Sequence, residues 1–253
     1  NYDGSGYSVA IIDSGYDRLH DNSSMIADYD FVFNDGNAFS GEWKSHGGAV
    51  ATVVREYAPD VNLIHLRVLG PRGTEADIED ALQWCIRNAS RYNIAAINMS
   101  LGDDTVSTRY VNGLCSDEIN TLSSMGIAAV IAAGNDSGYG AASPANNSPN
   151  AIVVGSVDAR NVIAYHSNRH PELVDIYALG TQVPVVTLTG GIDRYNGTSL
   201  AAPQVAGAFA SLQEASVNLT GRKIGPGEFL RLANSSGENG RGIYGDKVIN
   251  VDR

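Results

Sequence analysis

The sequence predicts an α/β fold in one domain, with a mainly parallel sheet that carries helices on both faces. Short, mostly apolar runs such as Ser8–Ile12 and Ile127–Ala133 are typical of strands buried on both sides of a parallel sheet. Between such runs lie longer segments whose apolar residues recur at helical spacing, and this alternation favours parallel pairing. A length of 253 residues without an internal repeat or linker indicates one domain over residues 1–253.

Each element is predicted from its local pattern. Ser45 can cap a helix whose apolar residues share one face and which ends before Pro59. Thr74–Asp77 resembles a capping box and opens a helix through about Asn93. The other predicted elements are helices over residues 111–125 and 226–234 and strands over residues 8–12, 29–33, 62–69, 95–100, 127–133, 152–156 and 183–188.

A helix of small residues is predicted to begin at Ser199. The segment that follows is rich in alanine and has no polar face before Gln213 and Glu214, which is typical of a buried helix. Ser199 would then lie at a helix N-terminus, where free N–H groups and the helix dipole favour negative charge. That environment suits a nucleophile whose reaction develops an oxyanion. The alternative is that Thr198 or Ser199 is only the N-cap of the helix.

The composition is that of a globular protein with an acidic surface. A hydrophobic content of 43% and a charged content of 18% allow a sizeable core. A formal net charge of −11 argues against nucleic acid or an anionic membrane as a partner. The most apolar short run, Ile127–Ala133, is too short to span a bilayer, so no membrane span is expected.

The chain start and the cysteines bear on the compartment. Asn1–Gly4 shows no signal peptide, which fits either a cytoplasmic protein or a mature form already trimmed. Cys85 and Cys115 are too few for a disulfide scaffold and lack metal-ligand spacing. We favour two buried free thiols, with one disulfide as the alternative.

Polar side chains are predicted to converge on one edge of the sheet. Asp13 ends the first strand, and Ser100 and Asn135 each follow a later strand. His46 and Ser199 each begin a helix, and in a parallel α/β layout the helix starts share the edge at which the strands end. Acyl transfer needs a nucleophile, a histidine base, a carboxylate that orients the histidine, and oxyanion donors. These four roles can be filled, in the same order, by Ser199, His46, Asp13 and Asn135.

The order of these residues separates the classes of serine hydrolase. An α/β-hydrolase needs a G-x-S-x-G elbow with the serine first, whereas Ser199 comes last and is followed by Leu200-Ala201. The chymotrypsin order places the histidine first, usually in an all-β chain. The order Asp, His, Ser is that of subtilisin.

Five motifs in this order resemble those of the subtilisin-like serine proteases, or subtilases. They are Val9–Gly15 for the aspartate, His46-Gly47 with Val50-Ala51 for the histidine, Asn98–Gly102 for substrate binding, Ala132–Asn135 for the oxyanion hole and Gly197–Pro203 for the serine. Tyr244-Gly245 with Ile249-Asn250 also resembles the segment that closes the family's catalytic domain. The resemblance covers nearly the whole chain.

The resemblance implies a peptide hydrolase. Ser199 would attack the scissile carbonyl, His46 would act as base and then acid, and Asp13 would hold the histidine tautomer. The Asn135 side chain and the Ser199 N–H would bind the oxyanion. Each residue also has a structural interpretation: Asp13 as a cap, His46 as a paired histidine at a helix start, and Asn135 as a turn residue. His20, His65, His166 and His170 carry no motif and are interpreted as structural or exposed.

The resemblance also implies where substrate binds. Ser100, Leu101 and Gly102 would pair with the substrate backbone as an added strand, with Pro71–Thr74 as the opposite edge. The pocket for the residue before the cut would lie between residues 100–102, the segment of Ala133, Gly134 and Asn135, and the segment 141–144 that holds Ala142. Small residues there suggest a large apolar side chain, whereas Asp136 would favour a basic one.

The chain departs from the family at four positions around the candidate site. Gly48 and Ala49 stand where the family usually has Thr and a second His. Gln204 replaces the usual His after Pro203, and Leu179 replaces a common Pro. None of these changes removes a group that the resemblance assigns to catalysis.

No cofactor is expected to be required, and no metal-binding residues are assigned. The Asn-rich calcium loop of many subtilisins has no counterpart, because Val54–Pro59 runs directly into the next strand. The acidic stretch from Asp17 to Asp35 offers carboxylates for Ca²⁺. We favour a solvated acidic loop.

The leading hypothesis is an active serine endopeptidase that acts on protein or peptide substrates. The alternatives are a catalytically weak subtilase fold used as a binding or regulatory module, and a processing protease of narrow specificity. A monomer is expected. The resemblance further suggests a precursor with an N-terminal pro-segment and a secreted or extracytoplasmic location, with an intracellular one as the alternative.

Overall fold

The structure is a computed structural model, and it describes residues 2–41, 45–103, 105–236, 238–239 and 247–248. The predicted closing motif, Tyr244-Gly245 with Ile249-Asn250, lies outside the described residues. The main sheet has nine strands in the order β12-β13-β9-β8-β6-β4-β1-β3-β2. Their bounds are β1 Ser8–Asp13, β2 Met25–Asp30, β3 Asn62–Arg67, β4 Ile94–Met99, β6 Ala128–Ala132, β8 Ile152–Val157, β9 Ile176–Leu179, β12 Glu238–Asn239 and β13 Lys247–Val248.

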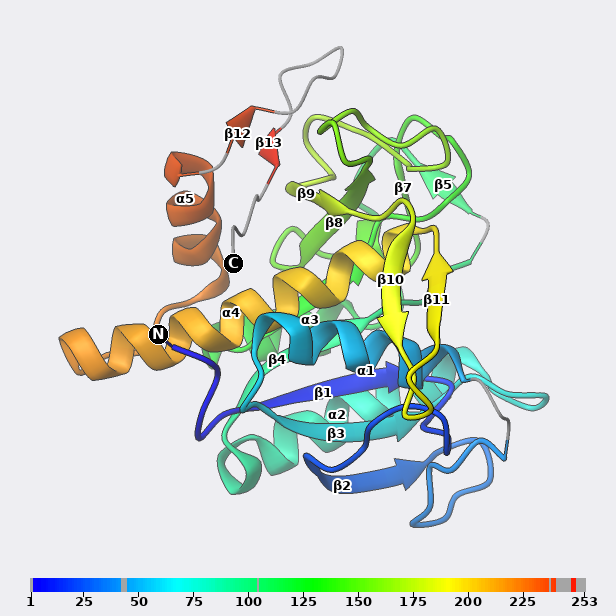
Figure 1. Ribbon diagram of the computed structural model, residues 1–253. Coiled ribbons are helices and arrows are strands. Elements are labelled where there is room, and N and C mark those ends of the chain that lie inside the picture. The colour runs from blue at the N-terminus through cyan, green and yellow to red at the C-terminus, as the bar shows by residue number, and fades with distance from the viewer. Residues whose placement is uncertain (1, 42–44, 104, 237, 240–246, 249–253) are drawn as a thin grey trace.

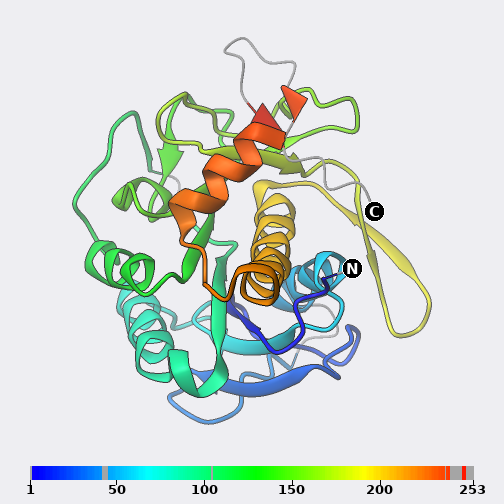
Figure 2. The ribbon, with the colours of Figure 1, turned by 90° about the vertical axis from the view of Figure 1, so that its left-hand side faces the viewer.

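Every neighbouring pair in this sheet is parallel except β12 and β13. Five α-helices are described: α1 His46–Tyr57, α2 Glu75–Tyr92, α3 Ser116–Ser124, α4 Thr198–Thr220 and α5 Pro226–Ser236. Figures 1 and 2 show α1 and α4 side by side on one face of the sheet and α2 and α3 on the other. The predicted α/β fold with helices on both faces is therefore confirmed.

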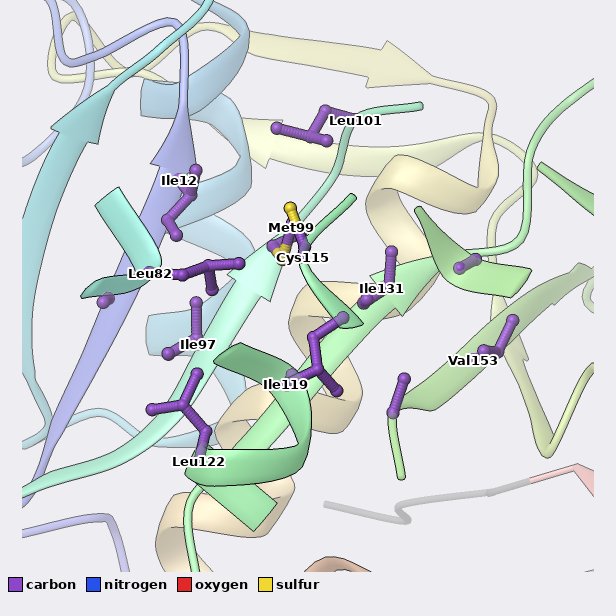
Figure 3. Packing of buried hydrophobic residues seen from close by; sticks show 14 of the residues in the cluster. Ile12, Leu82, Ile97, Met99, Leu101, Cys115, Ile119, Leu122, Ile131 and Val153 are labelled. Atoms are coloured by element: carbon purple, nitrogen blue, oxygen red, sulfur yellow. The ribbon is translucent and has the colours of Figure 1, made fainter. Parts of the chain in front are cut away.

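Strand β1 illustrates why the sheet is covered on both faces. Successive side chains of a strand point to opposite faces. Ala10 and Ile12 belong to the core that contains α2 and α3, and Figure 3 shows Ile12 with Leu82 and Ile119 in that layer. Val9 and Ile11 belong to the second core, with the inner faces of α1 and α4. All six residues of β1 are buried, which explains its continuous apolar pattern.

The helix starts follow their local signals. The Ser45 hydroxyl accepts the Gly48 N–H at 2.9 Å, and Thr74 forms the predicted capping box with Asp77. Helix α4 begins at Thr198, and its N-cap is Gly197, which supplies no side-chain cap. The interpretation of Thr198 or Ser199 as only the N-cap is therefore wrong.

Three predicted elements differ from the structure. The second strand is Met25–Asp30 instead of 29–33, because the Asp30 carboxylate accepts the Phe33 N–H and turns the chain. The helix predicted over 111–125 begins only at Ser116, because Cys115 adopts a left-handed conformation with φ of 66°. The strand predicted over 183–188 lies outside the main sheet.

That strand, β10 (Val183–Val186), pairs antiparallel with β11 (Ile192–Tyr195) in a hairpin, drawn in yellow, which projects from the body of the molecule in Figure 2. A second small sheet pairs β5 (Val106–Ser107) with β7 (Ala141–Ala142), followed by a 3₁₀ turn at Ala145–Asn147. Cys85 and Cys115 are both free and buried, as favoured. Among the described residues, no helix combines the length and apolarity needed to cross a membrane.

Candidate active site

Asp13 and His46 form a close pair at the carboxyl edge of the sheet. Strand β1 ends at Asp13, whose side chain is fully buried, and α1 begins at His46, whose side chain is 40% exposed. Both Asp13 oxygens lie 2.9 Å from His46 Nδ1, and the Ser14 N–H donates to Asp13 Oδ1 at 2.6 Å. Because a carboxylate only accepts hydrogen bonds, Nδ1 carries the proton and Nε2 is left as an acceptor.

The same pair sets the charge state of the histidine. The Asp13 carboxylate raises the pKa of His46 electrostatically and through its hydrogen bond, while partial desolvation of the ring opposes the shift. The imidazolium is thereby stabilised relative to a free histidine. A base that accepts a proton during a reaction benefits from this stabilisation.

Ser199 is the second residue of α4 and is held by Ser100. Pro203 has no N–H, so the Ser199 carbonyl lacks the N–H donor that it would otherwise have within the helix. The Ser100 hydroxyl donates to this carbonyl at 2.8 Å and itself accepts from Asn98 Nδ2 at 2.9 Å. The turn behind the serine is therefore fixed to the end of β4.

The Ser199 hydroxyl donates to the Ser100 carbonyl at 3.4 Å, a long contact. Within the described part of the chain, no hydrogen bond joins Ser199 to His46, although both line the same cavity. Hydrogen bonds between catalytic groups often tighten only when substrate is bound. The hydroxyl is thus held loosely next to the histidine that would activate it.

Asn135 is oriented by Thr198. Its Oδ1 accepts the Thr198 N–H at 2.8 Å and the Thr198 hydroxyl at 3.1 Å, and this hydroxyl accepts the Gly134 N–H at 3.3 Å. The amide nitrogen of Asn135 is consequently turned away from Thr198. The Ser199 N–H lies in the first turn of α4, where N–H groups have no partner within the helix. These two N–H groups are the predicted oxyanion donors.

Asn168 holds the loop that carries Asn135. Its Nδ2 donates to the Ala133 carbonyl at 3.0 Å and to Asp136 Oδ2 at 2.9 Å, and its Oδ1 accepts the Asp136 and Gly138 N–H groups. Gly134 has φ of +102°, and a Cβ there would lie 2.3 Å from Asn168 Nδ2. Only glycine therefore suits this position.

A cavity of about 360 Å³ lies over these groups. Among the predicted substrate-binding residues, Ser100, Leu101, Gly102 and Gly134 line it. Ala133 and Ala142 do not line it but are buried behind it, where the Ala142 N–H donates to the Ala133 carbonyl at 3.0 Å. No residue of the predicted Pro71–Thr74 edge lines the cavity, whereas Leu69 does.

A second Asp–His pair, fully buried, supports the start of α1. His20 Nδ1 lies 2.9 Å from Asp17, which also accepts the N–H groups of Leu19, His20 and Ser45. Burial opposes ionisation of Asp17, but these contacts together hold its pKa well below its usual range. A Cβ at Gly48 would lie 2.8 Å from His20 Nδ1. This crowding explains why Gly48 replaces the larger residue that is usual there.

The acidic stretch is only partly a solvated loop. Asp17 and Asp30 are each 1% exposed, and Arg67 donates to Asp30 at 3.0 Å. Asp21 pairs with Arg55. Over the described ranges, no group of three or more His, Cys, Asp or Glu side chains is arranged to hold a metal ion. None of the four histidines without a motif is exposed, since His20, His65, His166 and His170 are all buried.

Comparisons with known proteins identify the family. The sequence model of the subtilase family matches residues 4–227. The chain belongs to the subtilase family. It is 32% identical over 266 residues to Subtilisin E of Bacillus subtilis (strain 168), in a match that covers 99% of this chain and 66% of that protein. It is also 34% identical over 223 residues to a thermophilic serine proteinase of Bacillus sp. (strain AK1), in a match that covers 82% of this chain and 52% of that protein.

The chain thus spans 66% of the length of the first of these curated relatives and 52% of the second. In structure it is similar to a cold adapted subtilisin-like serine proteinase, with a TM-score of 0.80 and 27% identity over 100% of this chain and 91% of that chain. It is also similar to a protease of Pseudoalteromonas arctica PAMC 21717, with a TM-score of 0.82 and 25% identity over 98% of this chain and 89% of that one.

Four supporting residues of this subtilase are not assigned a supporting role by the sequence patterns. The sequence pattern indicates Thr198 only as a possible cap, although its position next to Ser199 is a usable signal. Asn168 has no local signal, because it acts on a loop more than 30 residues away. Asp17 and His20 are three residues apart in an irregular segment, so no periodic pattern marks them.

Proposed function

We propose that this subtilase is a serine endopeptidase that hydrolyses peptide bonds through Ser199, His46 and Asp13. The observation that supports it most is the Asp13–His46 pair, with both carboxylate oxygens 2.9 Å from Nδ1. His46, Asn135 and Ser199 line one cavity next to this pair. The names of relatives such as Subtilisin E support the same activity.

In the first half of the reaction, Ser199 Oγ attacks the scissile carbonyl carbon while His46 Nε2 takes the hydroxyl proton. The carbonyl oxygen becomes an oxyanion that Asn135 Nδ2 and the Ser199 N–H stabilise. Loss of one such donor typically costs about 3 to 4 kcal/mol of transition-state stabilisation. When the C–N bond breaks, His46 returns the proton to the leaving amine, and an ester on Ser199 remains.

In the second half, water replaces the amine. His46 Nε2 takes a proton from the water, whose oxygen attacks the ester carbonyl and forms a second oxyanion in the same place. Collapse releases the carboxylic acid, and the proton goes from His46 to Ser199 Oγ. Throughout both halves, Asp13 remains a carboxylate that holds Nδ1–H in place.

We propose that the substrate backbone pairs with residues 100–102 as an added strand, which provides affinity without sequence preference. The side chain before the cut would enter the cavity of about 360 Å³. Its volume and small residues favour a large apolar side chain. The carboxylates that line it, Asp103 and Asp136, favour a basic one instead. A panel of peptides varied at this one position distinguishes the two.

A serine-directed organophosphorus probe tests the proposal. We expect it to label the parent chain and not the Ser199→Ala variant. Hydrolysis of casein then separates a broad endopeptidase from a narrow processing protease, which would label but leave casein intact. A binding module with a weak site would do neither.

Several further properties stay predictions, some from the family resemblance and some from the sequence pattern. They are a precursor with an N-terminal pro-segment, a location outside the cytoplasm, a monomeric state, one domain over residues 1–253 and activity that does not require Ca²⁺. Size-exclusion chromatography with light scattering tests the monomer. The upstream coding sequence tests the pro-segment and a signal peptide.

A further inference from the structure

Gln204 connects the two helices that carry His46 and Ser199. His46 is the first residue of α1 and Ser199 the second of α4, so their separation depends on how the helices pack. The helices lie side by side in Figure 1 and approach closely, since a Cβ at Gly207 would lie 2.6 Å from the Val54 carbonyl oxygen. Any contact that fixes this packing next to Ser199 can influence catalysis.

The Gln204 side chain is 4% exposed, and all of its donors and its acceptor are used. The hydroxyl of Tyr57, the last residue of α1, donates to Gln204 Oε1 at 3.0 Å. Gln204 Nε2 donates to the Leu200 carbonyl at 2.8 Å and also to the Leu179 carbonyl. Because a buried amide is costly to leave unpaired, these three contacts define one arrangement.

The partners of Gln204 connect to the chain both before and after Ser199. Leu200 directly follows Ser199 in the first turn of α4. Leu179 ends β9, and the carbonyl of the next residue, Gly180, accepts the Gly197 N–H at 2.8 Å, two residues before Ser199. One side-chain amide therefore joins the end of α1, the first turn of α4 and the end of β9.

The residues packed around this arrangement include Ala49 and Leu179, at which the chain departs from the usual subtilase pattern. Ala49 and Leu200 share a buried cluster against which Tyr57 and Leu179 pack. A histidine at position 204 has two ring nitrogens and could not supply two donors and one acceptor at once. The connection is thus specific to the glutamine of this chain.

We propose that Gln204 is a positioning residue that, with Tyr57, fixes the first turn of α4 and the Ser199 hydroxyl relative to α1 and His46. The inference rests on the proposed function. Gln204 does not contact the reacting atoms, so its removal should misplace the nucleophile and leave substrate binding in place. A misplacement of about 1 Å can cost about 100-fold in rate.

Gln213→Met provides the matched control for Gln204→Met. Gln213 is a second buried glutamine on α4, 1% exposed, whose amide also bonds backbone groups: its Nε2 donates to the Ile224 carbonyl at 3.1 Å and its Oε1 accepts the Ile224 N–H at 2.8 Å. It lies toward the other end of the helix from Ser199. If both glutamines are only structural, the two variants behave alike in stability and in rate.

The experiment measures kcat and KM with a chromogenic peptide, the inactivation rate by an organophosphorus probe, and thermal unfolding. We expect Gln204→Met to lower kcat and the inactivation rate by about tenfold or more, with KM within about twofold. Gln213→Met should lose thermal stability and keep kcat. Tyr57→Phe, a milder change, should lower kcat about threefold in the parent and have no effect in Gln204→Met.

Each outcome is decisive. The positioning role would be overturned by equal kcat values for the Gln204→Met and Gln213→Met variants, or by additive effects of Tyr57→Phe and Gln204→Met. In either case the activity of the parent chain would leave the proposed function intact. A parent chain that neither reacts with the probe nor cleaves peptide would overturn both.

Discussion

Replacing Thr198 with valine should weaken the oxyanion site without altering the Asp13–His46 pair. The change keeps the shape of the side chain and removes the hydroxyl that bonds Asn135 Oδ1 at 3.1 Å and Gly134 N–H at 3.3 Å. Asn135 keeps its other bond, from the Thr198 N–H at 2.8 Å. The variant loses the hydrogen bond from the Thr198 hydroxyl to Asn135 and leaves the Gly134 N–H without this partner. Together these losses cost about 1 to 2 kcal/mol, which corresponds to about a five- to thirtyfold fall in kcat.

The assay is steady-state hydrolysis of a chromogenic peptide by four proteins: the parent, Thr198→Val, Asn135→Ala and the double variant. Asn135→Ala should lose about 10²- to 10³-fold in kcat, because it removes the donor itself. If Thr198 acts through Asn135, adding Thr198→Val to Asn135→Ala lowers kcat no further. An unchanged kcat for Thr198→Val, or the same loss in both backgrounds, would show that Thr198 does not act through Asn135.

The other predictions concern pH and metal ions. Because Asp13 raises the pKa of His46, kcat/KM should fall with decreasing pH around a midpoint above the ordinary pKa of histidine. The Asp13→Asn variant should lower the maximum rate about 10⁴-fold and shift that midpoint to lower pH. An unshifted midpoint would show that Asp13 does not raise the pKa of His46. Burial raises the pKa of Asp175 to about 7, so its ionisation destabilises the fold and stability should decrease as pH rises from about 4 to about 7. In buffer with a chelator, the Asp175→Asn variant should lose this decrease in the free energy of unfolding, which is at most about 4 kcal/mol. Its Tm should be higher than that of the parent at pH 8 but not at pH 4. Equal curves of stability against pH for the parent and the variant would contradict this prediction. EDTA should not abolish activity at moderate temperature, and a large drop in Tm on chelation would contradict this expectation.

Local signals were sufficient for the elements that carry the site. The apolar run that ends at Asp13, the cap at Ser45 before His46 and the alanine-rich helix after Ser199 depend on neighbours in sequence. Parallel topology then brings strand ends and helix starts to one edge. The four candidate residues could be predicted for this reason.

Features that depend on distant partners could not be predicted. β10 has the apolar pattern of a sheet strand, but its pairing with β11 outside the main sheet is decided by tertiary packing. The bonds of Gln204 to Tyr57 and Leu179 join residues far apart in sequence. The left-handed Cys115, which shortens α3, is a backbone conformation that helical periodicity does not report.

The proposed reaction requires that Ser199 is a nucleophile activated by His46. Its most direct test is the stoichiometry and rate of covalent modification by a small organophosphorus reagent, followed by mass spectrometry of the peptide that contains Ser199. We predict a single adduct at Ser199, formed more slowly as pH falls below the His46 pKa, and much more slowly in His46→Ala. Labelling of the parent no faster than that of Ser199→Ala would show that Ser199 is not the nucleophile.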